Sequence, residues 1–134
     1  MNIKSYLDST YLKTAKQANI SKKENTVLVQ NFVQEAIDEK FKLVMVRPDK
    51  VVLAQKLIAA QNSKVLIGTV IGFPEGTNTI DEKLFEAKKA LKDGADELDF
   101  VVNFEVFKLG EFSLVKDEIL QGTQFALLHN KKVK

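Results

Sequence analysis

The stretch GADELDFVVNF, residues 94 to 104, decides the fold. Gly94 is typical of a residue just beyond a helix end, and the apolar run after it predicts a buried strand over Glu97–Asn103. Side chains alternate along a strand, so one face carries Leu98, Phe100 and Val102, and the other carries Asp99, Val101 and Asn103. The second face therefore places a carboxylate, Asp99, inside a strand that should bury apolar surface.

Outward from this stretch, short strands are predicted to alternate with amphipathic helices. The other three strands are expected at Tyr6–Ser9, Lys42–Val46 and Lys64–Ile71. Two helix starts carry capping-box spacing, because Ser21 precedes Glu24 by three residues and Thr79 precedes Glu82 in the same way. The two remaining helices are expected to begin near Pro48 and to span about 113–128.

This alternation predicts an α/β fold with a parallel sheet and helical crossovers. The third strand, KVLIGTVI, is nearly continuous in apolar residues, as expected of a strand covered on both faces. Periodicity leaves open whether the sheet is a doubly wound layer or part of a closed barrel. The tail HNKKVK, residues 129–134, is expected to run into a fifth strand, and the whole chain is expected to be one domain.

Composition excludes several classes of function. The 134 residues carry a net charge of +2 without a clustered basic stripe, so we expect no nucleic-acid binding. With no cysteine and a single histidine, His129, the sequence suggests neither a thiol nucleophile nor a histidine metal site, and no cofactor is expected. No apolar run approaches the roughly 18 residues of a membrane span, so no membrane association and a cytoplasmic location are expected.

Asp99 is the first candidate for chemistry. In a (β/α)₈ barrel its face would point inward, with Asn103 near the rim where active sites form. A carboxylate held there with little water has a raised pKa, which suits proton transfer. The alternative is a structural buried aspartate paired with a lysine.

Two further stretches could contribute to a site. In LDSTYLK, residues 7–13, Asp8 and Thr10 are expected on one face at the carboxyl end of the first strand, although Asp-Ser-Thr is also a common turn or cap. The loop VIGFPEGTNT, residues 70–79, could present backbone N–H groups to an anion. It matches neither common phosphate-loop pattern, and an ordinary turn is the alternative.

Taken together, these stretches resemble a known family. LDSTYLK, GFPEG with the FEAKKAL helix after it, and GADELD have the order and spacing of the N-terminal half of deoxyribose-phosphate aldolase, across essentially all 134 residues. The resemblance implies a (β/α)₈ barrel, here about four βα units or half of a TIM barrel. It implies a class I aldolase that reversibly cleaves 2-deoxyribose 5-phosphate to glyceraldehyde 3-phosphate and acetaldehyde through a lysine Schiff base, without a metal. Asp99 would belong to the proton relay, and Asp8 and Thr10 would line the substrate pocket.

The sequence departs from that family in three ways. Ser9 stands where many members have histidine or leucine, and Met45 stands where many have cysteine. A full barrel takes about 200 residues or more, and the family's Schiff-base lysine lies on the sixth strand, in a segment similar to K-T-S-T-G that this chain lacks.

The lysines that are present do not offer a substitute nucleophile. Lys42 and Lys64 begin their strands, at the end of a barrel opposite the catalytic rim, and Lys13 and Lys108 lie in polar loops. We therefore expect the chain alone to be inactive.

Half a barrel would expose two sheet edges and its inner side chains, which favours association, with a two-fold homodimer as the expected assembly. Three alternatives stay open at this point: part of an aldolase acting on a phosphorylated sugar, a non-catalytic self-associating half-barrel, or a residual sugar-phosphate binder that uses the loop at 72–78.

Overall fold

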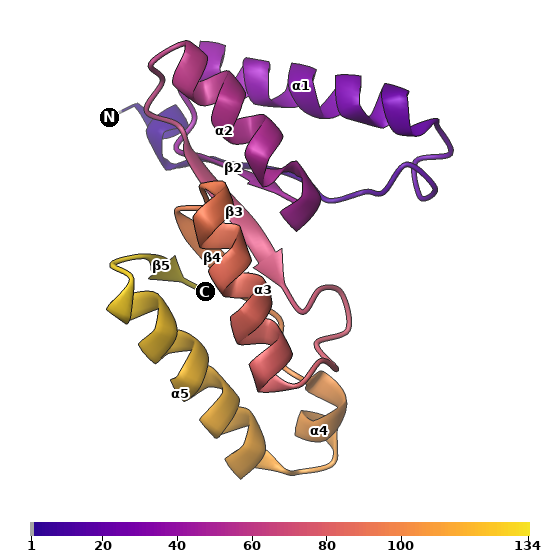
Figure 1. Ribbon diagram of the computed structural model, residues 1–134, viewed down its shortest axis with the longest axis vertical. Coiled ribbons are helices and arrows are strands. Elements are labelled where there is room, and N and C mark those ends of the chain that lie inside the picture. Colours follow the sequence, from indigo (N-terminus) through magenta and orange to yellow (C-terminus); the bar gives the residue numbers. More distant parts are fainter. Residues whose placement is uncertain (1) are drawn as a thin grey trace.

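The computed structural model describes residues 2–134, in which five strands alternate with helices (Figure 1). The strands are β1 (Asp8–Tyr11), β2 (Leu43–Val46), β3 (Leu66–Ile71), β4 (Glu97–Phe100) and β5 (Lys132–Val133). The α-helices are α1 (Lys22–Glu39), α2 (Val51–Ala60), α3 (Ile80–Asp93), α4 (Phe104–Lys108) and α5 (Phe112–Leu128). Two short 3₁₀ helices, η1 (Ile3–Tyr6) and η2 (Pro48–Lys50), precede β1 and α2.

Both predicted capping boxes form and fix the starts of the two helices. Ser21 Oγ accepts from the backbone N–H of Glu24 at 3.1 Å, and the Glu24 carboxylate accepts from the N–H of Ser21 at 2.8 Å. Thr79 and Glu82 repeat this exchange at the start of α3. Each box satisfies two backbone donors that the first turn of a helix leaves without partners, so these starts are encoded locally.

The sheet is parallel throughout, and its strands lie in chain order from β1 to β5. A parallel sheet in chain order with right-handed crossovers carries its helices on one face. Figure 1 shows α1, α2, α3 and α5 following one another along the molecule in the same order as their strands. This is the arrangement of consecutive βα units in a barrel wall, whereas a doubly wound sheet has helices on both faces.

The two faces of the sheet differ in cover. On the outer face Val44, Val46, Ile67, Ile71 and Leu98 pack with helix residues in one apolar core, and each is at most 7% exposed. On the inner face, which no helix covers, a smaller apolar cluster gathers around Leu43, Met45 and Val70. The structure therefore has a closed outer layer and an open inner surface.

Strand boundaries differ from the sequence prediction at β1 and β4, whereas the tail agrees with it. The first strand begins at Asp8, two residues later than expected, because Ile3–Tyr6 forms a 3₁₀ helix capped by the Asn2 side chain. The fourth strand ends at Phe100, and the short helix α4 follows it where an extension of the strand to Asn103 was expected. The tail does run into a fifth strand, β5, paired with β4.

Candidate functional site

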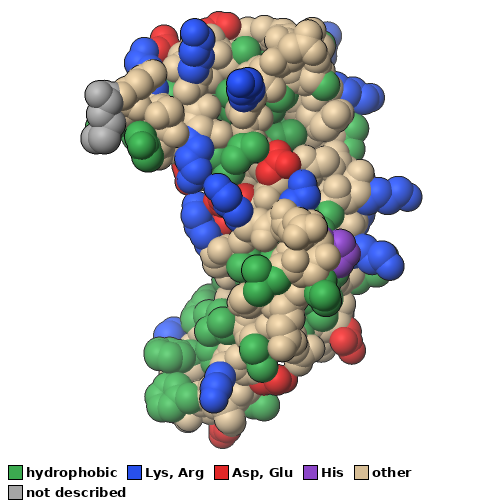
Figure 2. Space-filling model, turned by 90° about the vertical axis from the view of Figure 1, so that its left-hand side faces the viewer, with side chains coloured by type: hydrophobic (Ala, Val, Ile, Leu, Met, Phe, Trp, Pro, Cys, Tyr) green, Lys and Arg blue, Asp and Glu red, His purple; other side chains and the backbone are tan. Residues whose placement is uncertain are grey.

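The open inner face gathers charged side chains from strands at both ends of the sheet. The registers Asp8↔Leu43↔Leu66 and Gly68↔Glu97 place these residues on one side of the sheet, and alternation adds Asp99 to that side. Backbone hydrogen bonds from Phe100 N to Lys134 O and from Lys134 N to Leu98 O hold Lys134 beside Asp99. Figure 2 shows lysines next to acidic side chains along the hollowed edge of the molecule.

Lys134 is the centre of this group. Its Nζ lies 2.8 Å from Glu97 Oε1 and donates to Asp8 Oδ2 at 3.0 Å, although Asp8 is on the first strand and Lys134 directly follows the fifth. The two carboxylates, Glu97 first and then Asp8, raise the pKa of Lys134 above its ordinary value. Lys134 is therefore held protonated, as a fixed cation and not as a nucleophile.

Asp99 is half-buried and has no ion-pair partner within 4 Å among residues 2–134. Its Oδ1 is buried without a hydrogen bond. Desolvation raises the pKa of Asp99, Glu97 and Asp8 add repulsion in the same direction, and the attraction of Lys134 offsets only part of the rise. A raised pKa makes the carboxyl group easier to protonate, which is a property suited to a general acid or base.

The structure places the other predicted site residues differently from the expectation. Asp8 opens β1 and so lies at the amino end of the strand, where a carboxyl-end position was expected. The two-residue shift of the strand is the reason. Thr10 lies on the same face, opposite Met45 in the register. Asn103 is not in a strand: its Oδ1 accepts from Val106 N at 3.2 Å and caps α4.

The lysines considered as substitute nucleophiles do not reach Asp99 as ion-pair partners. Lys42 Nζ lies 3.6 Å from Asp8 Oδ1, just ahead of β2, and Lys108 pairs with Glu105 on α4. Lys13 and Lys64 are exposed and form no ion pair among residues 2–134. The inner face thus carries the Asp99 carboxylate and the charged Lys134. Among residues 2–134, no lysine amine is placed there to form a Schiff base.

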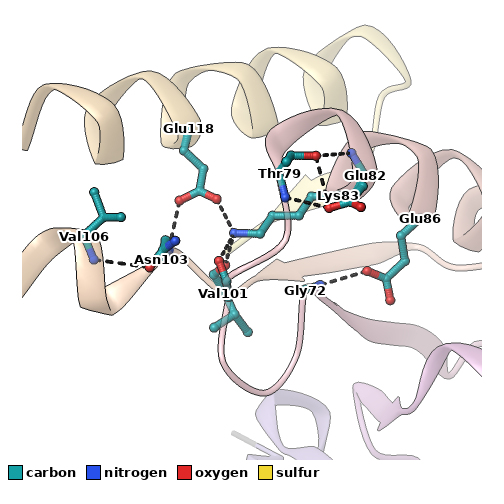
Figure 3. Close-up of polar contacts among 10 residues, drawn as sticks. Gly72, Thr79, Glu82, Lys83, Glu86, Val101, Asn103, Val106 and Glu118 are labelled. Atoms are coloured by element: carbon teal, nitrogen blue, oxygen red, sulfur yellow. Dashed lines mark hydrogen bonds and ion pairs between the residues drawn. The ribbon is translucent and has the colours of Figure 1, made fainter. Parts of the chain in front are cut away.

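A second polar network lies at the carboxyl end of β4 (Figure 3) and is centred on Lys83, a fully buried residue of α3. Its Nζ donates to Gly76 O and to Val101 O at 2.7 Å each and forms an ion pair with Glu118 of α5. The other carboxylate oxygen of Glu118 accepts from Asn103 N at 3.0 Å. The network therefore joins the β3–α3 loop, the residues after β4 and α5.

This network also explains the glycine-rich loop after β3. Gly76 has a φ of +70°, and a Cβ there would lie 2.2 Å from Val102 O, so the loop approaches β4 as only glycine allows. The N–H of Gly76 donates to Gly72 O at 2.8 Å, and the N–H of Gly72 donates to Glu86 Oε2 at 2.9 Å. Both donors are already bonded, so the loop's main observed role is packing over Lys83.

Two important lysines were missed by the sequence analysis. Lys83 was not singled out, although its spacing with Ile80, Ala87 and Ala90 puts it on the buried side of α3. Lys134 ends the tail that was expected to run into a fifth strand, and it was not singled out either. Only the pairing of the tail with β4 could have indicated its place beside Asp99, and strand pairing cannot be read from a single segment of sequence.

Within residues 2–134, no group of three or more His, Asp or Glu side chains is placed to hold a metal ion. No helix of the described chain is long and apolar enough to cross a membrane.

Comparisons with known proteins agree with this architecture. The family described as DeoC/LacD family aldolase matches residues 7–124. A deoxyribose-phosphate aldolase of Thermococcus gammatolerans is 38% identical over 134 residues, which cover all of this chain and 56% of the relative. A deoxyribose-phosphate aldolase of Metamycoplasma hominis is 42% identical over 75% of this chain and 46% of its own length.

Solved structures give the same result. The deoxyribose phosphate aldolase of Aeropyrum pernix, described as a tetramer of unique structure, superposes with a TM-score of 0.76 at 30% identity, covering 98% of this chain and 50% of that chain. A protein described as QR15, an aldolase, superposes with a TM-score of 0.75 at 32% identity, over 92% of this chain and 50% of that one. The chain spans about half the length of the relatives it matches and folds as half of a (β/α)₈ barrel. With a family match over residues 7–124 and the shared fold, the chain belongs to the DeoC/LacD family of aldolases.

Proposed function

We propose that this chain is the N-terminal half of a deoxyribose-phosphate aldolase and supplies the acidic side of its active site. The observation that carries the proposal is Asp99, a half-buried carboxylate with a raised pKa and an unbonded Oδ1 on the inner face of the half-barrel. In the reaction, 2-deoxyribose 5-phosphate is cleaved through a lysine Schiff base to glyceraldehyde 3-phosphate and acetaldehyde. Asp99 would exchange protons with the substrate and with the lysine that the missing half supplies.

The remaining inner-face residues would support this role. Lys134 would hold a fixed positive charge beside Asp99, and Asp8 and Thr10 would line the substrate pocket as the family resemblance implies. Glu97 keeps Lys134 in place through the 2.8 Å ion pair. The proposal includes a single partial-barrel domain, action in the cytoplasm in the breakdown of deoxyribonucleotides, and no requirement for a metal or cofactor.

The chain alone is proposed to be inactive, and a complementation assay tests both statements. The full 134-residue chain is expected to give no retro-aldol turnover and no borohydride-trapped adduct on any lysine. Co-expressed with the C-terminal half of the Thermococcus gammatolerans relative, it is expected to restore turnover. Asp99→Asn should abolish the restored activity, whereas the exposed control Asp38→Asn should keep it. Turnover by the chain alone, or full activity of Asp99→Asn in the complex, would contradict the proposal.

A second candidate, a self-associating half-barrel without catalysis, is favoured by exposed apolar side chains around α4 and α5. Phe107, Leu109 and Phe112 are 53%, 79% and 60% exposed. Figure 2 shows hydrophobic side chains gathered at the end of the molecule where Figure 1 places α4 and the start of α5. Light scattering after size exclusion tests the homodimer: a stable dimer together with failed complementation would favour this candidate, and a monomer at all concentrations would exclude it.

The third possibility, sugar-phosphate binding by the loop at 72–78, has less support. The N–H groups of Gly72 and Gly76 already donate within the protein. A titration of the chain with a sugar phosphate that left the amide resonances of this loop unchanged would exclude binding by the loop.

A further inference from the structure

A separate cleft lies at the carboxyl ends of β1 and β2, on the helix-covered side of the sheet. Its volume is about 270 Å³, and Tyr11 and Val29, which belong to the outer apolar core, form part of its wall. The inner face with Asp99 lies on the opposite side of the same strands, because Tyr11 and Thr10 point to opposite faces. The cleft is thus distinct from the proposed aldolase half-site.

The charge of the cleft is strongly positive. Four cationic side chains line it, and one carboxylate, Asp49, accompanies them; the cations are Lys13, Lys22, Arg47 and Lys50. Lys50 pairs with Asp49 at 3.2 Å, which accounts for the single negative charge. The other three form no salt bridge among residues 2–134. They come from three different segments of the chain, so it is the fold that brings these mutually repelling cations together.

Arg47 keeps most of its hydrogen-bonding capacity. Its guanidinium lies 5.5 Å from the centre of the Phe73 ring, and Nη1 makes one long bond, 3.4 Å, to Leu12 O. A guanidinium has five N–H donors in a rigid fork, so four are available to an oxyanion. The aromatic ring restricts the orientation of the fork, which lowers the entropy lost when a ligand binds.

The wall of the cleft contains a polar pair, buried Asn25 and half-buried Tyr11. Asn25 of α1 is 4% exposed, and its Nδ2 donates to Tyr11 Oη at 3.0 Å and to Lys13 O at 3.4 Å. Since Tyr11 Oη accepts in this bond, its own proton is free to donate, and it has no acceptor among residues 2–134. A half-buried hydroxyl donor beside three cations without ion-pair partners in the described chain is an arrangement suited to an anion with several oxygen acceptors.

We propose that this cleft binds a phosphate group, either as inorganic phosphate or as the phosphate of a small phosphomonoester. A dianion matches the excess of cations, and its oxygens can accept from the Arg47 fork, the ammonium groups of Lys13 and Lys22, and the Tyr11 hydroxyl together. This inference does not depend on the proposed aldolase activity, because Tyr11, Lys13, Lys22 and Arg47 have no part in that proposal.

Amide NMR on the full chain tests the proposal, with inorganic phosphate and glycerol 3-phosphate as separate probes at constant ionic strength. Both are expected to shift the resonances around 11–15, 22–25 and 47–50, and tighter binding of the ester would identify an organic phosphate as the better ligand. Lys13→Gln/Arg47→Gln should weaken binding at least about tenfold, and Arg47→Lys should weaken it less, because it keeps the charge but loses the fork.

The control is a double variant with the same change in charge at another cleft. Lys40→Gln/Lys64→Gln removes two lysines beside a cleft at the amino ends of β2 and β3 and should leave phosphate binding unchanged. Equal weakening by both double variants, shifts spread over all lysine-bearing surfaces, or the same shifts with sodium chloride alone would overturn the proposal.

Discussion

The outer and inner faces of the sheet are built from the same five strands, yet their side chains differ in polarity and in what they pack against. On the outer face, Val44 and Leu98 are fully buried against helices, and no charged side chain of the strands enters that core. On the inner face, Leu43 and Met45 are buried in a small apolar cluster, and the same face carries Glu97 and Asp99. The outer face therefore holds the larger apolar core, and the inner face holds the charged groups.

Strand alternation produces this division without any special sequence device. Each strand sends every second residue to each face, so a strand can hold a dry core and a reactive surface at once. In β4, Leu98 packs outward while Asp99, the next residue, faces inward. Three sets of variants test how the two faces differ.

The largest effect is expected at the Lys83–Glu118 pair, which joins α3 and α5 of the helix layer. Glu118→Ala should lower the free energy of unfolding by about 3–5 kcal/mol, because it leaves the ammonium of Lys83 buried without a counter-charge. Urea denaturation measures the change. Glu105→Ala, which breaks the exposed pair with Lys108, should cost about 1 kcal/mol or less.

A double variant keeps this prediction falsifiable if Glu118→Ala folds poorly. Lys83→Met/Glu118→Leu removes both charges and should recover most of the lost stability. If the double variant is as unstable as the single one, hydrogen bonds to Gly76 O and Val101 O matter more than the charge balance.

Leu98 and Leu43 are both 0% exposed, so replacing each by alanine compares the two faces directly. Leu98→Ala on the outer face should cost about 3–5 kcal/mol, because the helix layer cannot collapse into the cavity. Leu43→Ala on the inner face should cost less, about 2 kcal/mol, because its apolar cluster with Met45 and Val70 is small and its few neighbours can shift into the space. Equal losses in thermal or urea unfolding would mean that the inner face is covered in solution, for example by a second copy.

The smallest effect concerns the charge on the inner face. The raised pKa of Asp99 means that the folded chain binds its proton more tightly than the unfolded chain does, so ionisation of Asp99 destabilises the fold as pH rises. Asp99→Asn should therefore be more stable than the parent chain at pH 7, and the difference should vanish below 3.8, the ordinary value of an aspartate. Urea midpoints against pH measure this, and Asp38→Asn should show no such pH-dependent gain.

Local signals predicted the helix starts well and the strand ends poorly. The capping boxes at Ser21 and Thr79 depend on side chains within three residues of the backbone groups they bond, so a short segment contains all the information. The start of β1 depends on pairing with β2, and the end of β4 depends in part on Glu118 bonding Asn103 N. Those partners are distant in sequence, whereas the Asn103 cap on Val106 N is local.

The candidate site was predictable in part for the same reason. Alternation alone placed Asp99 on the inner face, and the register between β3 and β4 agrees. Its neighbour Lys134 could not be derived from the tail, because the contact requires β5 to pair with β4 across the α5 helix. Lys83 likewise acquires its role only when the β3–α3 loop, β4 and α5 meet around it.

The contact between Lys134 and Asp8 has a consequence for how the chain folds. It joins residues 126 positions apart, so it closes a loop that contains nearly every other element. Closing such a loop costs chain entropy, which one partly solvated ion pair offsets only in part. The contact is therefore favourable only after the intervening βα units have docked. Formation of this contact should therefore mark the last step of assembly, and high salt should weaken it while β1 and β5 stay paired with β2 and β4.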